Sequence, residues 1–369
     1  MNHRQAKRAD TSAHPQGPSA LEAEAAQERF GCLSRMRQQI LLNELLSTRT
    51  AELMLAYPDL LAIGQGFRRR RTNARRVTGE IVSGERCVLF LVRTKFKCRS
   101  ASRRRLPAHL YCHDVIRGRR VLLAIPTDVD EARPLVANAA PPSAVDVDGV
   151  GEYGVLTCRV DCRLPNGAVE QRVLSCRHVF GLSGIRAPDL PTAIISHEAK
   201  PIGNAVDVRG KLGSNVPSGF DAQLMQPLTP GAADHCLLRA HWPGGFASYA
   251  GEFETTMWLH FPRQSGPFRA HYRGIWIHLK VQYGTGETSF AANVGPVIEV
   301  DLDNSDAPRA GDSGSPLVIG FTKAKFAGMH IAGLVDNGDG RALSYCIPAY
   351  ALLDPKNYAG AAGEVWELP

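Results

Sequence analysis

Three side chains of this sequence have the types and the order needed to break an acyl bond. Ser313 lies inside the glycine-rich stretch GDSGSP, His178 ends a strand-like run in LSCRHVF, and Asp221 stands among apolar residues in GFDAQL. A hydroxyl that attacks a carbonyl carbon needs an imidazole to take its proton and a carboxylate to orient that imidazole. An aspartate in an apolar stretch is costly unless it is paired. The spacing therefore favours nucleophilic catalysis over a simple tight turn at Ser313.

Taken together, GDSGSP, CRHVF and FDAQL resemble the motifs of the trypsin-like (chymotrypsin-fold) serine proteases. The similarity covers about 150–353 and implies two six-stranded β-barrels with a catalytic triad in the cleft between them. On that resemblance His178 is the general base, Asp221 orients it and Ser313 is the nucleophile. The backbone N–H groups of Gly311 and Ser313 would form the oxyanion hole.

The same resemblance implies a pocket for the substrate side chain before the scissile bond. Ala307, six residues before the nucleophile, would lie at its base. Gly333 would flank the mouth, and the wall would contain Tyr345, Cys346 and Ile347. A small neutral base argues against a strict Arg or Lys preference, so we expect a small or apolar residue there. The reaction needs no cofactor and no metal ion.

Other motifs favour other chemistry less well. GVGEYG at 149–154 matches a dinucleotide-binding pattern, but a strand-like run follows it where that motif needs a helix. Cys158, Cys162 and Cys176 with His178 suggest a zinc set, yet their spacing is poor for a structural site. We expect a glycine-rich strand entry and buried thiols instead.

Charge is distributed unevenly along the 369 residues. Residues 1–135 carry 25 basic and 13 acidic side chains, a net charge of +12, whereas the remainder carries −5. The run RRRRTNARR at 68–76 holds six arginines, which is typical of a solvated turn, and it could also bind nucleic acid or an acidic protein. No aromatic residues interrupt the run, as single-strand binding would favour.

Composition divides the chain into five segments. We expect a disordered tail at 1–20, a helical segment at 21–59, a small basic α+β domain at 60–130, a proline-rich linker at 131–149 and the protease-like domain at 150–369. The predicted fold class is mainly β: a chymotrypsin-like double β-barrel after a helical segment and a small α+β domain.

Within the small domain the sequence predicts three strands and a short helix. The strands fall at 60–67, 86–96 and 120–130, and the helix near 106–114. AIGQGF, CVLFLVRTK and LAIPTDVDE resemble the leading domain of bacterial and plant cytosolic trypsin-like peptidases of the Narrow-leaf-1 type.

These observations predict an intracellular serine endopeptidase with a narrow protein-substrate range. The N-terminus lacks the apolar core of a signal peptide, and no run is long enough to span a membrane, so we expect a cytoplasmic protein. Residues 1–135 would regulate it or bind a regulatory protein, and a bacterial defence pathway is one context by analogy. The alternative is a scaffold, or a nucleic-acid or protein-binding module, that uses the protease fold and the basic N-terminal half.

Overall fold

The computed structural model describes most of the chain from residue 18 to residue 369. The ranges outside the description are 1–17, 72–79, 94–105, 132–135, 138–144, 148–152, 181–193, 198–199, 213–218, 230, 232–235, 238–241, 243, 263–265, 284–288, 304–307, 310, 321–322 and 336–341. All structural statements below concern the remaining residues.

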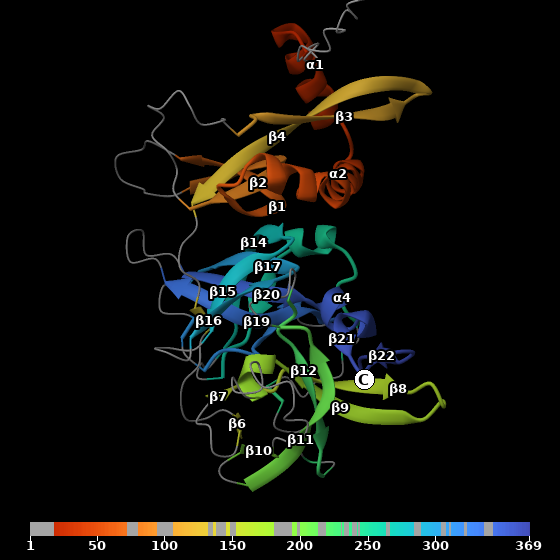
Figure 1. The fold of residues 1–369 in the computed structure, drawn as a ribbon, viewed down its shortest axis with the longest axis vertical. Coiled ribbons are helices and arrows are strands. Elements are labelled where there is room, and N and C mark those ends of the chain that lie inside the picture. Colours follow the sequence, from red (N-terminus) through yellow and green to blue (C-terminus); the bar gives the residue numbers. More distant parts are fainter. Residues whose placement is uncertain are drawn as a thin grey trace, which may run out of the picture.

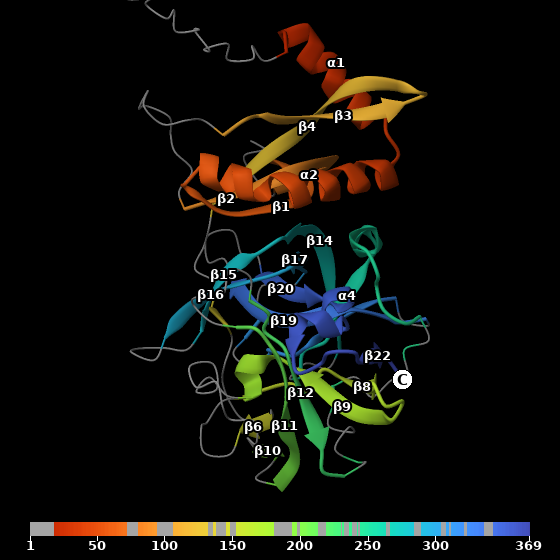
Figure 2. The same ribbon diagram turned by 45° about the vertical axis from the view of Figure 1, so that its right-hand side comes forward.

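The described elements form three tiers, seen in two views in Figure 1 and Figure 2. Helices and strands of the N-terminal third lie at the top, a closed barrel occupies the middle and a second sheet lies below it. The predicted fold class is confirmed: the chain is mainly β, and helices and a small mixed layer precede the two β-units. No helix in the described ranges is long and apolar enough to cross a membrane.

The N-terminal layer contains two helices and four strands. They are α1 (Ala20–Gly31), α2 (Arg35–Ala56), β1 (Leu60–Arg71), β2 (Glu80–Val92), β3 (His109–Ile116) and β4 (Arg119–Glu131). The two helices are separate because Ser34 caps α2: its side chain accepts a hydrogen bond from the Arg37 N–H. Their apolar residues, such as Phe30 and Leu42, pack with Ile63 and Phe90 of the strands in one core.

The predicted short helix near 106–114 is wrong. That stretch is β3, which forms an antiparallel hairpin with β4. The two turn residues, Arg117 and Gly118, both have positive φ angles, 50° and 74°. Such a turn matches the twist of a tight hairpin. The other three predicted strands correspond to β1, β2 and β4.

A sheet joins the N-terminal layer to the barrel. β1 pairs antiparallel with β14 (Phe268–Trp276), so that Gly64 lies opposite Trp276. A Cβ atom on Gly64 would overlap the Ile275 carbonyl oxygen. The glycines of AIGQGF therefore let two backbones approach closely where the two units meet.

Six antiparallel strands close into the barrel. In order around it they are β13 (Met257–Leu259), β14, β17 (Val297–Leu302), β20 (Ala342–Pro348), β19 (Lys325–Val335) and β18 (Pro316–Ile319). The hairpin of β15 (Leu279–Tyr283) and β16 (Phe290–Val294) extends the same sheet. Buried residues such as Met257, Ile298 and Leu317 pack together in a second core.

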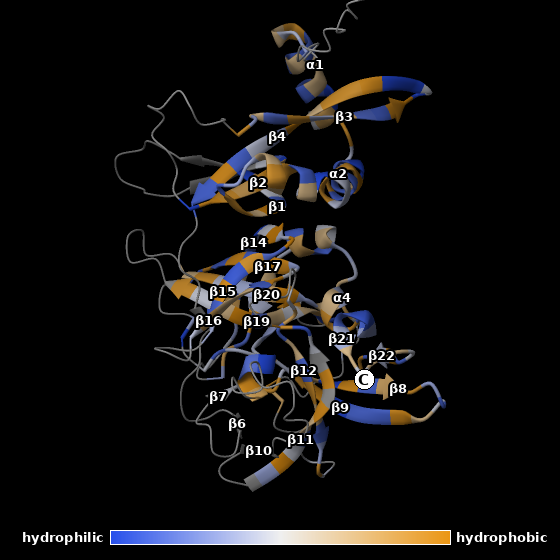
Figure 3. Cartoon of the chain, viewed as in Figure 1, coloured by the Kyte–Doolittle hydropathy of each residue, from blue (hydrophilic) through white to orange (hydrophobic). Residues whose placement is uncertain are grey.

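The lower sheet contains nine strands. They are β6 (Val145–Val147), β7 (Tyr153–Gly154), β8 (Cys158–Arg163), β9 (Val169–Ser175), β10 (Ile194–His197), β11 (Lys200–Gly210), β12 (Gln223–Pro227), β21 (Tyr358–Ala359) and β22 (Val365–Glu367). Along β8, buried and less buried residues alternate, and bands of opposite hydropathy follow β8 and β9 in Figure 3. This period of two leaves one face of the sheet for the core.

The segment expected to be a linker contributes strands to both sheets. β5 (Val136–Ala137) pairs with β15 and β19, and β6 pairs with β7 and β10. The C-terminal strands β21 and β22 pair with β11 and β8 of the lower sheet. The segment 131–149 is thus paired with both the barrel sheet and the lower sheet, and the C-terminal strands are paired with the lower sheet.

Candidate active site

His178 lies where the lower sheet turns towards the barrel. It belongs to a short 3-10 helix, η1 (Arg177–Phe180), that directly follows β9, and every residue of η1 is buried. A Cβ atom on Gly154 would overlap the Val179 side chain, so that glycine admits η1 against β7. The Arg177 side chain donates to the Gly210 carbonyl at 2.7 Å, which fixes η1 to the end of β11.

Asp221 lies on the connection from β11 to β12. The Gly210 N–H donates to the Ala222 carbonyl and the Phe220 N–H to the Lys211 carbonyl, each at 2.7 Å, so the backbone on both sides of Asp221 is held. The Asp221 side chain is fully buried. The sequence therefore places this carboxylate in an apolar setting, and its stability there depends on hydrogen-bond donors.

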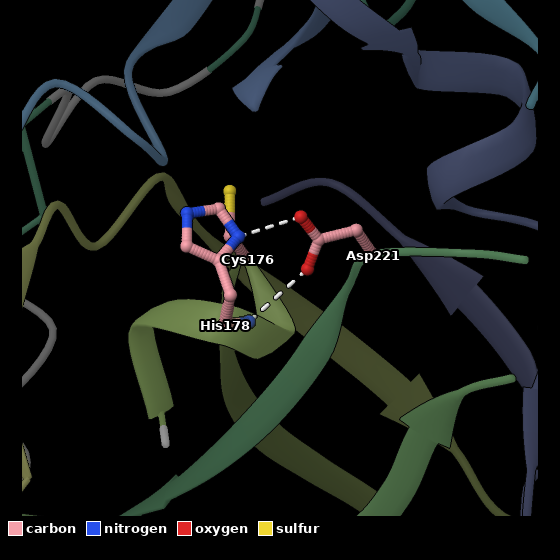
Figure 4. Close-up of side chains that lie close together, drawn as sticks. All are labelled: Cys176, His178 and Asp221. Atoms are coloured by element: carbon pink, nitrogen blue, oxygen red, sulfur yellow. Dashed lines mark hydrogen bonds and ion pairs between the residues drawn. The ribbon is translucent and has the colours of Figure 1, made fainter. Parts of the chain in front are cut away.

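The two residues form a buried hydrogen-bonded pair. His178 Nδ1 lies 2.6 Å from Asp221 Oδ2, and the His178 backbone N–H donates to Oδ1 at 3.1 Å (Figure 4). Because a carboxylate only accepts, Nδ1 carries the proton of this hydrogen bond, and in the neutral imidazole Nε2 is then the nitrogen with the lone pair. Figure 4 shows this second ring nitrogen pointing away from Asp221. Among the described residues, Nε2 has no hydrogen-bond partner.

Ser313 lies in a turn that leads into β18. Gly311 and Gly314 on either side of it have φ angles of 91° and 94°, a region that favours glycine. The Ser313 carbonyl accepts a hydrogen bond from the Val155 N–H at 2.7 Å, and the Gly314 carbonyl accepts one from the Thr157 hydroxyl at 2.6 Å. The turn belongs to the barrel, and these bonds fix it to the lower sheet.

One carbonyl connects the turn of Ser313 with the strand that precedes His178. The His330 carbonyl accepts the Gly314 N–H at 2.8 Å and the Cys176 thiol at 3.3 Å. The Ser313 hydroxyl is buried and donates to the carbonyl of the next residue, Ile331, at 3.3 Å. The structure thus brings the three candidate triad residues to one seam between barrel and lower sheet, with the hydroxyl directed at β19.

Two of the amides in the GDSGSP turn stabilise the turn itself, and a third binds β19. The Asp312 N–H donates to the Arg309 carbonyl at 3.1 Å, and the Ser315 N–H donates to the Asp312 carbonyl at 3.0 Å. The Gly314 N–H is bound to His330, as described above. The Asp312 carboxylate accepts from the Arg309 N–H at 2.6 Å. The expected oxyanion donors, the N–H groups of Gly311 and Ser313, stay a prediction.

Four of the five expected pocket residues fall within the described structure. Ala307 lies outside the described residues. A Cβ atom on Gly333 would overlap the Pro308 ring, so this part of β19 is tightly covered. Tyr345, Cys346 and Ile347 are buried along β20, which pairs with β19.

Sequence reasoning gave no role to His330, whose ring is fully buried beside the seam. Its Nδ1 lies 2.7 Å from the Ser344 hydroxyl, and its ring packs edge-on against Phe261. Burial lowers the pKa of His330 to about 3, and the nearby His178 acts in the same direction. The ring is therefore neutral at physiological pH. Its Nε2 has no hydrogen-bond partner in the described part of the chain.

Only part of the zinc set that the sequence analysis rejected lies together in the structure. The potential ligand atoms of Cys176, His178 and Asp221 lie within 4.8 Å of one another, and this group does not include Cys158 or Cys162. Burial, followed by the charge of Asp221, raises the pKa of the Cys176 thiol well above its usual value. Because a metal needs the thiolate and His178 Nδ1 is already bonded to Asp221, the donor set fits an oriented histidine better than a metal.

Comparison with known proteins adds little beyond the fold. No protein-family model matches the chain, and no curated protein matches it in sequence. Among solved structures it is similar to the NS6 protease from murine norovirus 1, with 14% identity over 48% of this chain and 80% of that chain, and a TM-score of 0.27. At so low a similarity, only the geometry of this chain can support a function for it.

Proposed function

We propose that this chain is a serine endopeptidase that hydrolyses peptide bonds of protein substrates through an acyl-enzyme. The observation that carries the proposal is the buried pair of His178 Nδ1 and Asp221 Oδ2, 2.6 Å apart, beside the glycine-bracketed turn of Ser313. An imidazole that is held in one tautomer with an unbonded Nε2 is prepared to accept a proton.

In the proposed mechanism His178 accepts and returns a proton in each of two steps. The Ser313 oxygen attacks the scissile carbonyl carbon while its proton passes to His178 Nε2, and the N–H groups of Gly311 and Ser313 bind the oxyanion. His178 then gives that proton to the leaving amine, and the C–N bond breaks. A water molecule, deprotonated by His178, attacks the acyl-enzyme. The ester bond to Ser313 then breaks, the new carboxyl end leaves, and His178 returns the proton to the Ser313 oxygen.

The resting position of the hydroxyl supports a regulated enzyme. Ser313 is fully buried and its hydroxyl is bonded to the Ile331 carbonyl, so the hydroxyl must turn away from β19 before it can attack a substrate. A nucleophile that is buried at rest is consistent with a narrow range of protein substrates. We propose a cytoplasmic location, with bacterial defence as one context.

The N-terminal layer is coupled to the barrel by buried charge. Arg86 of β2 bonds Glu254 at the end of η3 (Ala250–Glu254) and Gln39 of α2. Arg35 at the start of α2 also pairs with Glu254, at 3.4 Å. A partner that moves the N-terminal layer would therefore act on the barrel, which supports regulation through residues 1–135.

The proposal is tested by cleavage of a proteome-derived peptide library, with new termini identified by mass spectrometry. The full-length protein is compared with Ser313→Ala. We expect new termini after small or apolar residues in the wild type and none in the variant. Termini that do not depend on Ser313 would contradict the proposal. Cleavage after residues with a side-chain carbonyl would keep the peptidase but overturn the small or apolar pocket.

The second candidate is a scaffold or a nucleic-acid or protein-binding module. The observation that favours it is the net charge of +12 in residues 1–135. Retention on DNA that falls steeply with added salt, in a Ser313→Ala protein, would support binding as a function in addition to or in place of peptide hydrolysis.

A further inference from the structure

We propose that Tyr283 is a positioning residue for the candidate triad: its hydroxyl holds the Asp221 carboxylate from the opposite β-unit. The inference rests on the proposed function. Tyr283 is the last residue of β15, on the barrel side, whereas Asp221 and His178 belong to the lower sheet.

Tyr283 binds the same carboxylate oxygen of Asp221 that binds His178. The Tyr283 hydroxyl donates to Asp221 Oδ2 at 3.1 Å, and that same oxygen accepts the His178 Nδ1–H at 2.6 Å. With the His178 backbone N–H on Oδ1, the carboxylate receives three hydrogen bonds. A fully buried carboxylate needs such donors, and this one obtains a donor from each side of the seam.

The tyrosine is fixed and remains a donor. Its ring stacks on Phe290, its partner across the β15–β16 hairpin, with centroids 5.2 Å apart. The centroid of the Tyr283 ring also lies 5.5 Å from that of the His178 ring, so the tyrosine limits movement of the imidazole on one side. Burial first, and then the Asp221 charge, raise the pKa of the Tyr283 hydroxyl well above its usual value, which keeps the proton on the phenol.

Removal of the Tyr283 hydroxyl changes the electrostatic effect of Asp221 on the His178 ring. Without the hydroxyl, Asp221 Oδ2 carries more negative charge towards Nδ1 and stabilises the imidazolium more strongly. The acid limb of the pH–rate profile then moves to higher pH. Among the described residues, Cys176 and His330 are further titratable groups near the pair. Both are uncharged at neutral pH because burial raises the pKa of the thiol and lowers that of the imidazole to about 3.

The experiment measures the rate of Ser313 labelling by a fluorophosphonate probe from pH 5 to pH 9. Tyr283→Phe is compared with Tyr358→Phe, which also removes a buried hydroxyl, but one that bonds the Leu352 carbonyl at 2.7 Å and not Asp221. We expect the midpoint of the acid limb to rise by about 0.5 to 1 pH unit in Tyr283→Phe and to stay in place in Tyr358→Phe. Identical midpoints in the two variants would overturn the positioning role.

A second measurement is independent of activity and of the folding of that variant. Wild type labelled with fluorotyrosine, whose phenol is a stronger donor, should show the low-field proton resonance of His178 Nδ1 displaced from its position in unlabelled protein. An unmoved resonance would overturn the proposal. If wild type does not react with the probe but its Nδ1 resonance responds, the proposed peptidase fails and the Tyr283 contact stands.

Discussion

The buried neutral ring of His330 predicts a specific loss of stability in acid. The folded chain holds the pKa of His330 at about 3, from an ordinary value of 6.5, because burial disfavours the charged ring. A group that binds its proton only after unfolding favours the unfolded state as the pH falls. The contribution is therefore absent above pH 6.5 and grows as the pH decreases from 6.5 towards 3.

The size of the effect follows from the shift. Each pH unit below 6.5 lowers the free energy of unfolding by about 1.4 kcal/mol, so the ring alone should account for about 2.7 kcal/mol between pH 7.5 and pH 4.5. Other groups titrate in the same range, and a variant that lacks only this imidazole removes its part from the total.

Urea unfolding of wild type and of His330→Asn at pH 7.5 and pH 4.5 isolates the contribution of the His330 ring to the free energy of unfolding. The amide of asparagine can still bond the Ser344 hydroxyl but does not titrate. We expect the variant to lose about 2.7 kcal/mol less than wild type on acidification, whatever its stability at pH 7.5. Equal acid losses in wild type and His330→Asn would refute the reasoning.

Three further substitutions test the site and the joint between the units. Asp221→Asn should keep the fold and reduce the rate of Ser313 labelling by about 10⁴, because the amide no longer holds the His178 tautomer; a loss below tenfold would argue against its role. Gly64→Ala should lower the unfolding free energy by about 1–3 kcal/mol, since its Cβ meets backbone of β14, whereas Gly84→Ala, with open space around it, should not. Glu254→Gln leaves the Arg86 charge buried without its partner and should lower the free energy of unfolding, measured in urea, by about 3–5 kcal/mol. An unchanged free energy of unfolding would mean that this ion pair does not couple the N-terminal layer to the barrel.

Local patterns explain why much of the site was predictable. The turn of Ser313 requires positive φ angles, which the glycines on either side of it permit. An aspartate among apolar residues requires a donor, which His178 supplies. These are properties of short segments and of residue types. The order of the three motifs along the chain then predicted that they meet.

The parts that sequence reasoning missed depend on pairing over long distances. Tyr283 is 62 residues from Asp221 and its strand pattern is that of any core tyrosine. The contact of β1 with β14 has no signature in either strand besides the three glycines Gly64, Gly66 and Gly274. Near 106–114 the apolar spacing was compatible with a helix, but Leu110 and Cys112 instead lie opposite Ile125 and Leu123 of β4, and cross-strand packing decided the outcome.

The central claim is that Ser313 is a nucleophile activated by His178. The most direct test is fluorophosphonate labelling of the full-length protein, with mass spectrometry to locate the adduct, on wild type beside Ser313→Ala and His178→Ala. The account predicts one adduct on Ser313 that disappears in both variants. Labelling elsewhere in the chain, or labelling of Ser313 that persists without His178, would contradict it.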